Sequence, residues 1–198
     1  MPKVTEEHRA AMRRRIQDAA LACIARSGFA GASMSDIVKE AGLSAGAVYV
    51  YYSGKGELAV DAGRRVMEGR LRELVEMSEA ADPEPPAVVI PRLVARILGE
   101  DETAGLALQV WGEAAYDPEF AGLAREIFAE ISARFEDYLR AWFARGAGLG
   151  EEAAAARAVV LAPAVMALMQ GCLVQTTILG GTAAARCRAS IAALLDGL

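Results

Sequence analysis

Histidine is nearly absent from this chain of 198 residues, which contains only His8. Zinc sites, serine or cysteine catalytic triads and di-iron carboxylate bundles all need well-placed imidazoles. We therefore expect no metal, no cofactor and no catalytic residues. A small helical enzyme with a pocket between Trp111 and Trp142 is the alternative, but no pair of nucleophile and base accompanies these residues.

Cysteine is also scarce: Cys23, Cys172 and Cys187 are odd in number and form no C-x-x-C motif. Each lies in an apolar stretch, which is typical of reduced core thiols in a cytoplasmic protein, with a redox-sensing role as the alternative. No apolar segment follows the basic N-terminal residues. We therefore expect no secretory signal peptide and a cytoplasmic location.

Runs of β-branched residues are few, and only 7 residues are proline, whereas 42 residues are alanine. Because alanine has the highest helix propensity, this composition favours helices. Hydrophobic residues make up 54% of the chain and charged residues 24%, which excludes a disordered protein. The composition predicts an all-α fold.

Charge is missing from residues 158–185, a stretch long enough to cross a bilayer. The stretch contains Pro163, Gln170 and Gln175, and neither flank carries the basic cluster that fixes membrane orientation. A helix that is apolar on all sides also occurs in a protein core or at a subunit interface. We expect a buried helix and no membrane contact.

The net charge of −5 is unevenly distributed. Residues 1–55 contain eight Lys or Arg and five Asp or Glu, so they are basic, whereas residues 56–198 are acidic. A basic first quarter is typical of a region that meets a polyanion, although surfaces of ordinary proteins show asymmetry of this size as well.

Two short helices are predicted within the basic region. The first helix of the chain runs from Thr5 or Glu6 to Arg26 and is ended by Gly28. Ser33 is a natural N-cap for a second helix, with Asp36 in the capping-box position and Gly42 as the break. Ser44 caps a third helix over residues 45–52. Helices this short must pack on the first one, here through the apolar residues Ile37, Val38, Ala41, Leu43 and Val48. The pattern predicts a helix-turn-helix.

The remaining chain is predicted to be helical at about 55–77, 87–99, 102–115, 118–145, 151–180 and 182–196, with a proline-rich break at 82–86. An apolar stripe repeats every three or four residues through 118–145 and predicts a core-facing helix; it consists of Phe120, Leu123, Ile127, Ile131, Phe135, Tyr138 and Trp142. We predict two domains, a helix-turn-helix domain at 1–55 and a ligand-binding and dimerisation domain at 56–198.

These residues resemble the TetR family of bacterial transcriptional regulators. The resemblance covers positions 9–60 and includes Ala41-Gly42-Leu43-Ser44, Tyr49, the pair Tyr51-Tyr52, and Lys55 with Leu58. The stretch from Val110 to Glu119 resembles the BetI-like subgroup of that family. The resemblance implies a DNA-binding regulator with a helical effector domain, whose last two long helices pair with a second copy.

The third helix is slim enough to enter a major groove, with its N-terminal residues facing base edges. Its small side chains can touch a thymine methyl group but cannot form bidentate hydrogen bonds, so backbone contacts and DNA shape carry more of the specificity. Tyr52 matches the family's packing aromatic, and we assign it to the core. The predicted DNA-binding residues are Arg13, Arg14, Ser33, Ser35, Ala45, Gly46, Ala47, Tyr49, Tyr51 and Lys55.

The effector pocket is predicted among aromatic and methionine side chains of the second domain. Each of these residues also fits a purely structural role in the core, because stripes at helical spacing usually reflect packing. The candidates are Trp111, Glu113, Tyr116, Phe128, Phe135, Trp142, Met166, Met169 and Gln170. We expect a homodimeric repressor of a palindromic operator, released by a small lipophilic, aromatic or cationic effector. The alternative is a helix-turn-helix protein without an effector.

Overall fold

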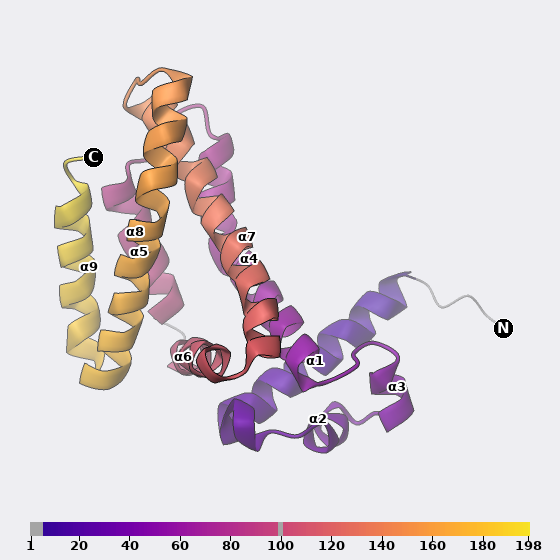
Figure 1. The fold of residues 1–198 in the computed structure, drawn as a ribbon. Coiled ribbons are helices and arrows are strands. Elements are labelled where there is room, and N and C mark those ends of the chain that lie inside the picture. The colour runs from indigo at the N-terminus through magenta and orange to yellow at the C-terminus, as the bar shows by residue number, and fades with distance from the viewer. Residues whose placement is uncertain (1–5, 99–100) are drawn as a thin grey trace. The chain divides into compact units, whose positions relative to one another are not determined.

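The computed structural model describes the backbone of residues 6–98 and 101–198, and the side chains of these residues except 101–107, 110, 118–120 and 123. Its helices, shown in Figure 1, are α1 (Glu6–Gly31), α2 (Met34–Ala41), α3 (Ala45–Tyr49), α4 (Lys55–Glu79), α5 (Pro86–Leu98), α6 (Asp101–Tyr116), α7 (Pro118–Ala141), the π-helix η1 (Trp142–Gly146), α8 (Glu151–Leu179) and α9 (Gly181–Leu195). Within the described residues there is no strand, so the all-α prediction is confirmed.

The predicted helix positions agree with the structure, with three corrections. Gly28 does interrupt the first helix with φ 75° and ψ 165°, but helical structure resumes after this kink and continues to Gly31. The third helix ends at Tyr49 instead of continuing to Tyr52. The helix predicted over 118–145 leaves α geometry after Ala141 and finishes as the π-turn η1. The predicted start at Thr5, and the side chains of Phe120 and Leu123, lie outside the described residues.

The chain forms two compact units. The first comprises Met1–Val66 and Leu106–Ile127, and the second comprises Met67–Gly105 and Phe128–Leu198. Both α4 and α7 therefore continue from one unit into the other. The compact units do not follow the predicted domain boundary between residues 55 and 56, because residues 106–127 group with the N-terminal helices. The division into a DNA-binding and a ligand-binding domain stays a prediction.

Each unit has its own apolar core. In the first unit, Ile16, Ile24, Ile37, Val48 and Leu58 are fully buried and join α1 to α2, α3 and the start of α4. Burial of large aliphatic side chains contributes about 1.5–3 kcal/mol each, which is what holds helices as short as α2 and α3 in place.

The second unit is built around α5, α8 and α9, with the C-terminal part of α7 packed against them. Its largest fully buried side chains include Phe135, Tyr138, Phe143 and Ile90. The hydroxyl of Tyr138 donates to the backbone oxygen of Glu84 at 2.8 Å, so its polar end is satisfied inside the core.

Candidate nucleic-acid interface and effector site

The turn between α2 and α3 has the capping geometry that the sequence predicts. The Ser33 hydroxyl accepts the backbone N–H of Asp36, and the Asp36 carboxylate accepts the backbone N–H of Ser33, which completes a capping box. Gly42 closes α2 with a left-handed φ of 61°, and Ser44 accepts the N–H of Ala47 at the start of α3. These bonds satisfy helix-end groups that would otherwise lack partners, and they fix the angle at which α3 leaves α2.

Helix α3 has one buried residue and an exposed side. Val48 is fully buried, whereas Tyr49 is 53% and Val50 75% exposed. Ala45 and Gly46 are exposed as well, and a Cβ placed on Gly46 would meet no atom within 4 Å. The face formed by Ala45, Gly46, Tyr49 and Val50, which we call the α3 face, is therefore open to a partner. It carries no charge, since no charged residue occurs between Glu40 and Lys55.

One carboxylate oxygen joins three parts of the first unit. Oδ2 of Asp61, on α4, accepts hydrogen bonds from the hydroxyl of Tyr52 at 2.6 Å, from Nε2 of Gln17 at 2.8 Å and from Nη2 of Arg13 at 3.0 Å. Burial alone raises the pKa of Asp61, but the bonds from Tyr52, Arg13 and Gln17 outweigh it and hold the pKa below its usual value. The same surroundings raise the pKa of Tyr52 to about 12, chiefly through burial. Asp61 thus ties the end of the helix-turn-helix to α1 and α4.

The predicted arginine contacts differ in how they are held. Arg13 is ion-paired with Asp61 and lies over the Tyr52 ring at 5.6 Å, so its guanidinium already has partners within the chain. Arg14 is exposed. Arg15, which was not among the predicted contacts, donates to the backbone oxygen of Ala41 at 2.7 Å and braces the end of α2. DNA contact by Arg13 and Arg14 stays a prediction.

Lys55 is the first residue of α4, as predicted, but its ammonium has partners that the sequence did not indicate. Its ammonium donates to the backbone oxygens of Phe29 at 2.6 Å and Ala32 at 2.9 Å, and it lies 4.4 Å from the centre of the Phe29 ring. An ammonium has three N–H donors, so one remains for a phosphate. The predicted phosphate contact of Lys55 is untested, and a tethering role is now established beside it.

Of the other predicted contacts, Ser35 is exposed, and Tyr51 and Ala47 are half-buried beside the α3 face. The Ser33 hydroxyl is engaged in the cap and also hydrogen-bonds to the Ser35 hydroxyl at 2.8 Å. Tyr52 is 1% exposed, as expected for the packing aromatic.

The effector candidates are divided between the two compact units. Trp111, Glu113 and Tyr116 belong to the first unit, and Tyr116 is 90% exposed. The other candidates belong to the second unit, where Trp142, Met166 and Met169 pack around the core that contains Phe135. Phe128 and Gln170 are half-buried. Their role in ligand binding stays a prediction.

Trp142 has a buried donor that no described protein group accepts. Its indole nitrogen Nε1 is inaccessible and has no hydrogen-bond partner. The residue begins the π-turn η1, and a Cβ on Gly146 would stand 2.1 Å from the indole ring, so only glycine fits there. Buried donors are normally satisfied, and π-turns often occur at functional sites, so an acceptor oxygen supplied by a ligand would suit this position.

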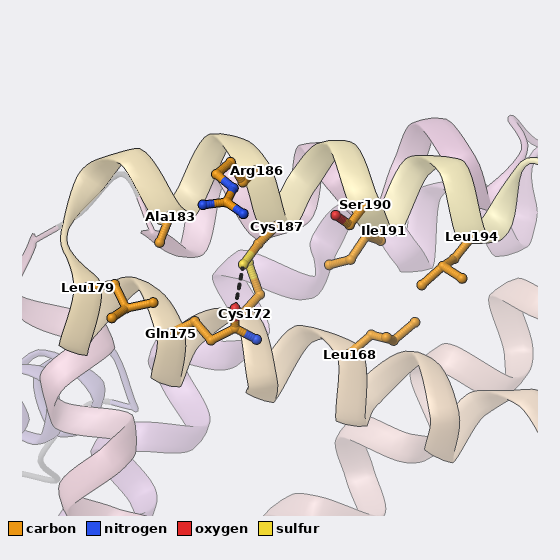
Figure 2. A pocket seen from close by; sticks show the side chains of 10 residues that line it. All are labelled: Leu168, Cys172, Gln175, Leu179, Ala183, Arg186, Cys187, Ser190, Ile191 and Leu194. Carbon is orange, nitrogen blue, oxygen red and sulfur yellow. Dashed lines mark hydrogen bonds between the residues drawn. The ribbon is translucent and has the colours of Figure 1, made fainter.

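Sequence reasoning did not anticipate a groove between α8 and α9. Figure 2 shows this pocket of about 260 Å³, whose lining includes Leu168, Cys172, Gln175, Cys187, Ile191 and Leu194. The Cys187 thiol lies 3.6 Å from Oε1 of Gln175. Burial, assisted by a hydrogen bond with Cys187, raises the pKa of Cys172 to about 12, so this thiol is protonated and unreactive at neutral pH. None of the three cysteines forms a disulfide.

Large aliphatic side chains project from α8 and α9. Ile178 is 72%, Leu179 66% and Leu194 64% exposed, and Val159 and Val160 are exposed on α8 as well. These residues lie at several positions around the two helices, and we refer to the five together as the α8–α9 face. Covering them with another protein surface would remove this apolar area from water. By length and hydropathy α8 could also cross a membrane, which is weak evidence because the core helix of a soluble protein passes the same test.

Comparisons with known proteins agree with this geometry. Residues 16–62 match the family described as "Bacterial regulatory proteins, tetR family", and residues 89–198 match "BetI-type transcriptional repressor, C-terminal". The chain is 31% identical to the HTH-type transcriptional repressor Rv1474c of Mycobacterium tuberculosis over 71% of each chain. It is 40% identical to the uncharacterized HTH-type transcriptional regulator YfiR of Bacillus subtilis over 72 residues, which span 33% of that protein.

Solved structures share the fold. The transcriptional regulator FadR of Bacillus subtilis, solved in complex with stearoyl-CoA, superposes with a TM-score of 0.71 at 18% identity, covering 93% of this chain and 98% of that one. A regulator from Saccharomonospora viridis, solved in complex with choline, superposes with a TM-score of 0.67 at 23% identity, covering 94% and 96%.

Proposed function

Because the chain belongs to the TetR family of bacterial transcriptional regulators, we propose that it is a repressor that binds a palindromic operator as a homodimer and leaves it when a small lipophilic, aromatic or cationic effector binds. The single observation that carries the proposal is the exposure of two apolar surfaces, the α3 face and the α8–α9 face. In this account, the first meets DNA and the second meets another copy of the chain.

Operator binding places α3 in the major groove. Ala45, Gly46 and Ala47 lie at its N-terminal end, where side chains reach base edges, and their small size suits contact with thymine methyl groups. Tyr49 and Tyr51 donate hydroxyls to phosphates on either side of the groove. Lys55 offers its remaining N–H, and the start of α4 adds free backbone N–H groups, to another phosphate.

The remaining predicted contacts lie on α1 and α2. Ser35 is exposed in the first turn of α2, next to the Ser33 cap, and Arg14 is exposed on α1. For Arg13 to reach a phosphate, its guanidinium has to exchange Asp61 for DNA. We therefore rank Arg14 above Arg13 as a contact.

Homodimer formation covers the α8–α9 face. Each large aliphatic side chain that becomes buried contributes about 1.5–3 kcal/mol, and a two-fold axis uses every such residue twice. The groove between α8 and α9 adds a concave element for a partner helix. Two DNA-binding heads related by a two-fold axis match an operator with two-fold sequence symmetry.

The effector is bound in the second domain, in the cytoplasm. Aromatic and methionine side chains supply an apolar lining, and the Trp142 indole N–H supplies one directed donor. The choline and stearoyl-CoA complexes of proteins with this fold support cationic and lipophilic classes, respectively. Within the second unit, the Trp142 ring can contact a cation through its face. Trp111 and Glu113, which belong to the first unit, stay predicted contacts of the effector.

Release follows from a shift between two conformations. Helix α4 begins at the helix-turn-helix and continues into the second unit, so an effector that favours one position of α4 changes the spacing of the two heads. Effector and operator must then weaken each other's binding by the same factor.

Selection from a random duplex library, followed by sedimentation of the selected complex, tests the proposal. We expect an enriched palindrome bound by two protomers. A library without enrichment, or a single protomer on an asymmetric site, would contradict it.

Effector binding can be screened by quenching of Trp111 and Trp142 with cationic dyes, choline and stearoyl-CoA. A compound that quenches should weaken operator binding. If bound compounds leave operator affinity unchanged, the derepression scheme is wrong, and a helix-turn-helix protein without an effector becomes the better description.

A further inference from the structure

The peptide group of Phe29 is held from two sides by distant parts of the chain. Its N–H donates to Oε1 of Gln109, on α6, at 3.1 Å. Its carbonyl oxygen accepts the ammonium of Lys55, at the first residue of α4, at 2.6 Å. Phe29 is 7% exposed, so these bonds are largely shielded from water. One residue of the DNA-binding head is thus bonded to both α4 and α6.

The kink at Gly28 makes the N–H of Phe29 available. With φ 75° and ψ 165°, Gly28 interrupts the helical path just before Phe29. A Cβ on Gly28 would stand 3.8 Å from the same Gln109 oxygen, so the side chain of Gln109 lies over the kink. An N–H donor needs an acceptor, which assigns the oxygen of the Gln109 amide to this bond.

The contact leads directly to the elements that carry α3. Lys55 also donates to the carbonyl oxygen of Ala32, the residue before the Ser33 cap of α2. Displacement of Phe29 therefore acts on the start of α2 and on the start of α4 together. Helix α2 precedes α3 in the chain and α4 follows it, so both flank α3.

We infer that Gln109 is a positioning residue that couples α6 to the DNA-binding head through Phe29 and Lys55, beside the continuous path along α4. The inference rests on the proposed function, because it supplies a regulatory contact for the proposed operator site. Gln109 touches neither DNA nor effector in this account. It adjusts the head by holding or releasing the Gly28 kink.

Coupling between two sites is reciprocal, so operator binding must change the conformation or environment of α6 even when no effector is known. Trp111 lies two residues after Gln109 on α6 and serves as a fluorescent probe of this helix. The chain contains 2 tryptophans, so Trp142→Phe leaves Trp111 as the only indole fluorophore. The probe is the duplex that the chain itself selects from a random library.

In the Trp142→Phe parent, we expect the selected duplex to change the emission of Trp111 in a saturable way. Adding Gln109→Leu, which has no acceptor, should reduce this change and weaken operator binding about fivefold or more. Adding Gln109→Glu keeps an acceptor oxygen and should restore both. A purely structural role would lower thermal stability in Gln109→Leu while leaving the Trp111 response intact.

Hydrogen exchange of the unsubstituted protein gives a second readout that does not depend on folding of a variant. Operator binding should change the exchange rate of the Phe29 amide and of amides around Gln109. An operator-bound protein in which neither Trp111 nor these amides respond would overturn the inference while leaving the proposed function intact. Absence of any selected duplex would instead contradict the proposed function.

Discussion

The α3 face and the α8–α9 face are both exposed and apolar, but they are built differently. The α3 face belongs to a helix of 5 residues and consists of Ala45, Gly46, Tyr49 and Val50. The α8–α9 face extends over helices of 29 and 15 residues and consists of large aliphatic side chains. The α3 face is short and includes the hydroxyl group of Tyr49, whereas the α8–α9 face is long and aliphatic.

This difference indicates different partners. The short α3 face begins with two small residues and fits a DNA groove with polar edges. In such a groove, shape and backbone contacts matter more than the buried area. A long aliphatic face gains most from a second apolar protein surface. Substitutions confined to one face show whether each face serves its own partner alone.

The largest effect is expected from Ile178→Glu on the α8–α9 face. The substitution removes an apolar side chain and buries a carboxylate in each of two copies, which should raise the dimer dissociation constant about a thousandfold or more. Operator affinity should fall with it, because two linked heads bind far more tightly than one. Sedimentation equilibrium measures the first effect and fluorescence anisotropy the second.

Val50→Glu is the matched control on the α3 face, since Val50 is 75% and Ile178 72% exposed. It should leave the dimer intact and abolish operator binding, because it places a carboxylate against phosphates. A dimer that survives Ile178→Glu at micromolar concentration would remove the α8–α9 face as the interface.

Asp61→Asn tests how the head is held behind the α3 face. The pKa of Asp61 is lower in the folded protein than in the unfolded chain, where it is about 3.9. The charged carboxylate therefore stabilises the fold at pH values above the unfolded pKa. This stabilisation is lost as the pH falls through the folded pKa. At about pH 7 we expect Asp61→Asn to reduce the free energy of unfolding by about 1.5–3 kcal/mol, as for hydrogen bonds to a charged group. The difference should shrink at about pH 3.

Asp18→Asn serves as its control, because Asp18 is an exposed partner of Arg65. Exposed pairs contribute about 0–1 kcal/mol. Urea unfolding at both pH values decides the matter, and equal losses for the two variants would refute the role assigned to Asp61.

Gly146→Ala tests the packing of Trp142 in the second unit. A Cβ at 2.1 Å from the indole ring forces the ring or η1 to move, which should cost about 1–3 kcal/mol of stability. Gly171→Ala is the control, because a Cβ there meets open space inside α8, and alanine in a helix interior should raise stability by up to about 1 kcal/mol. Equal urea midpoints for the two variants would show that the ring is not confined by Gly146.

The smallest effect is expected from Lys55→Ala on the salt dependence of DNA binding. Loss of one phosphate contact should reduce the slope of log K against log salt by about 0.9. Arg134→Ala, an exposed cation of α7, should leave the slope unchanged. If Lys55→Ala lowers thermal stability without altering the slope, Lys55 acts only as the tether of Phe29 and Ala32.

Much of the helix-turn-helix region could be predicted from interactions between residues close in the sequence. The caps at Ser33, Gly42 and Ser44 each act over a few residues, so their spacing in the sequence specifies the geometry. The bonds of Lys55 to Phe29 and of Gln109 to Phe29 join residues 26 and 80 positions apart. No local pattern encodes such contacts, because they depend on how separate helices pack.

The effector candidates illustrate the limit of periodicity. The stripe that includes Phe135 and Tyr138 is buried as predicted, because an apolar repeat identifies a core-facing side. The same reasoning could not separate Tyr116, which is exposed, from Trp142, whose nitrogen is buried without a partner. Periodicity reports which side of a helix is apolar, but not whether a neighbour, a ligand or a second subunit covers it.

The most direct test of the central claim is duplex selection by the unsubstituted chain and by Gly46→Gln. The added side chain enters open space, so it should not disturb the fold, and glutamine can form paired hydrogen bonds with adenine. If α3 lies in the major groove, the selected palindrome changes at one position in each half-site, toward adenine. An identical selected sequence for both proteins would contradict the account.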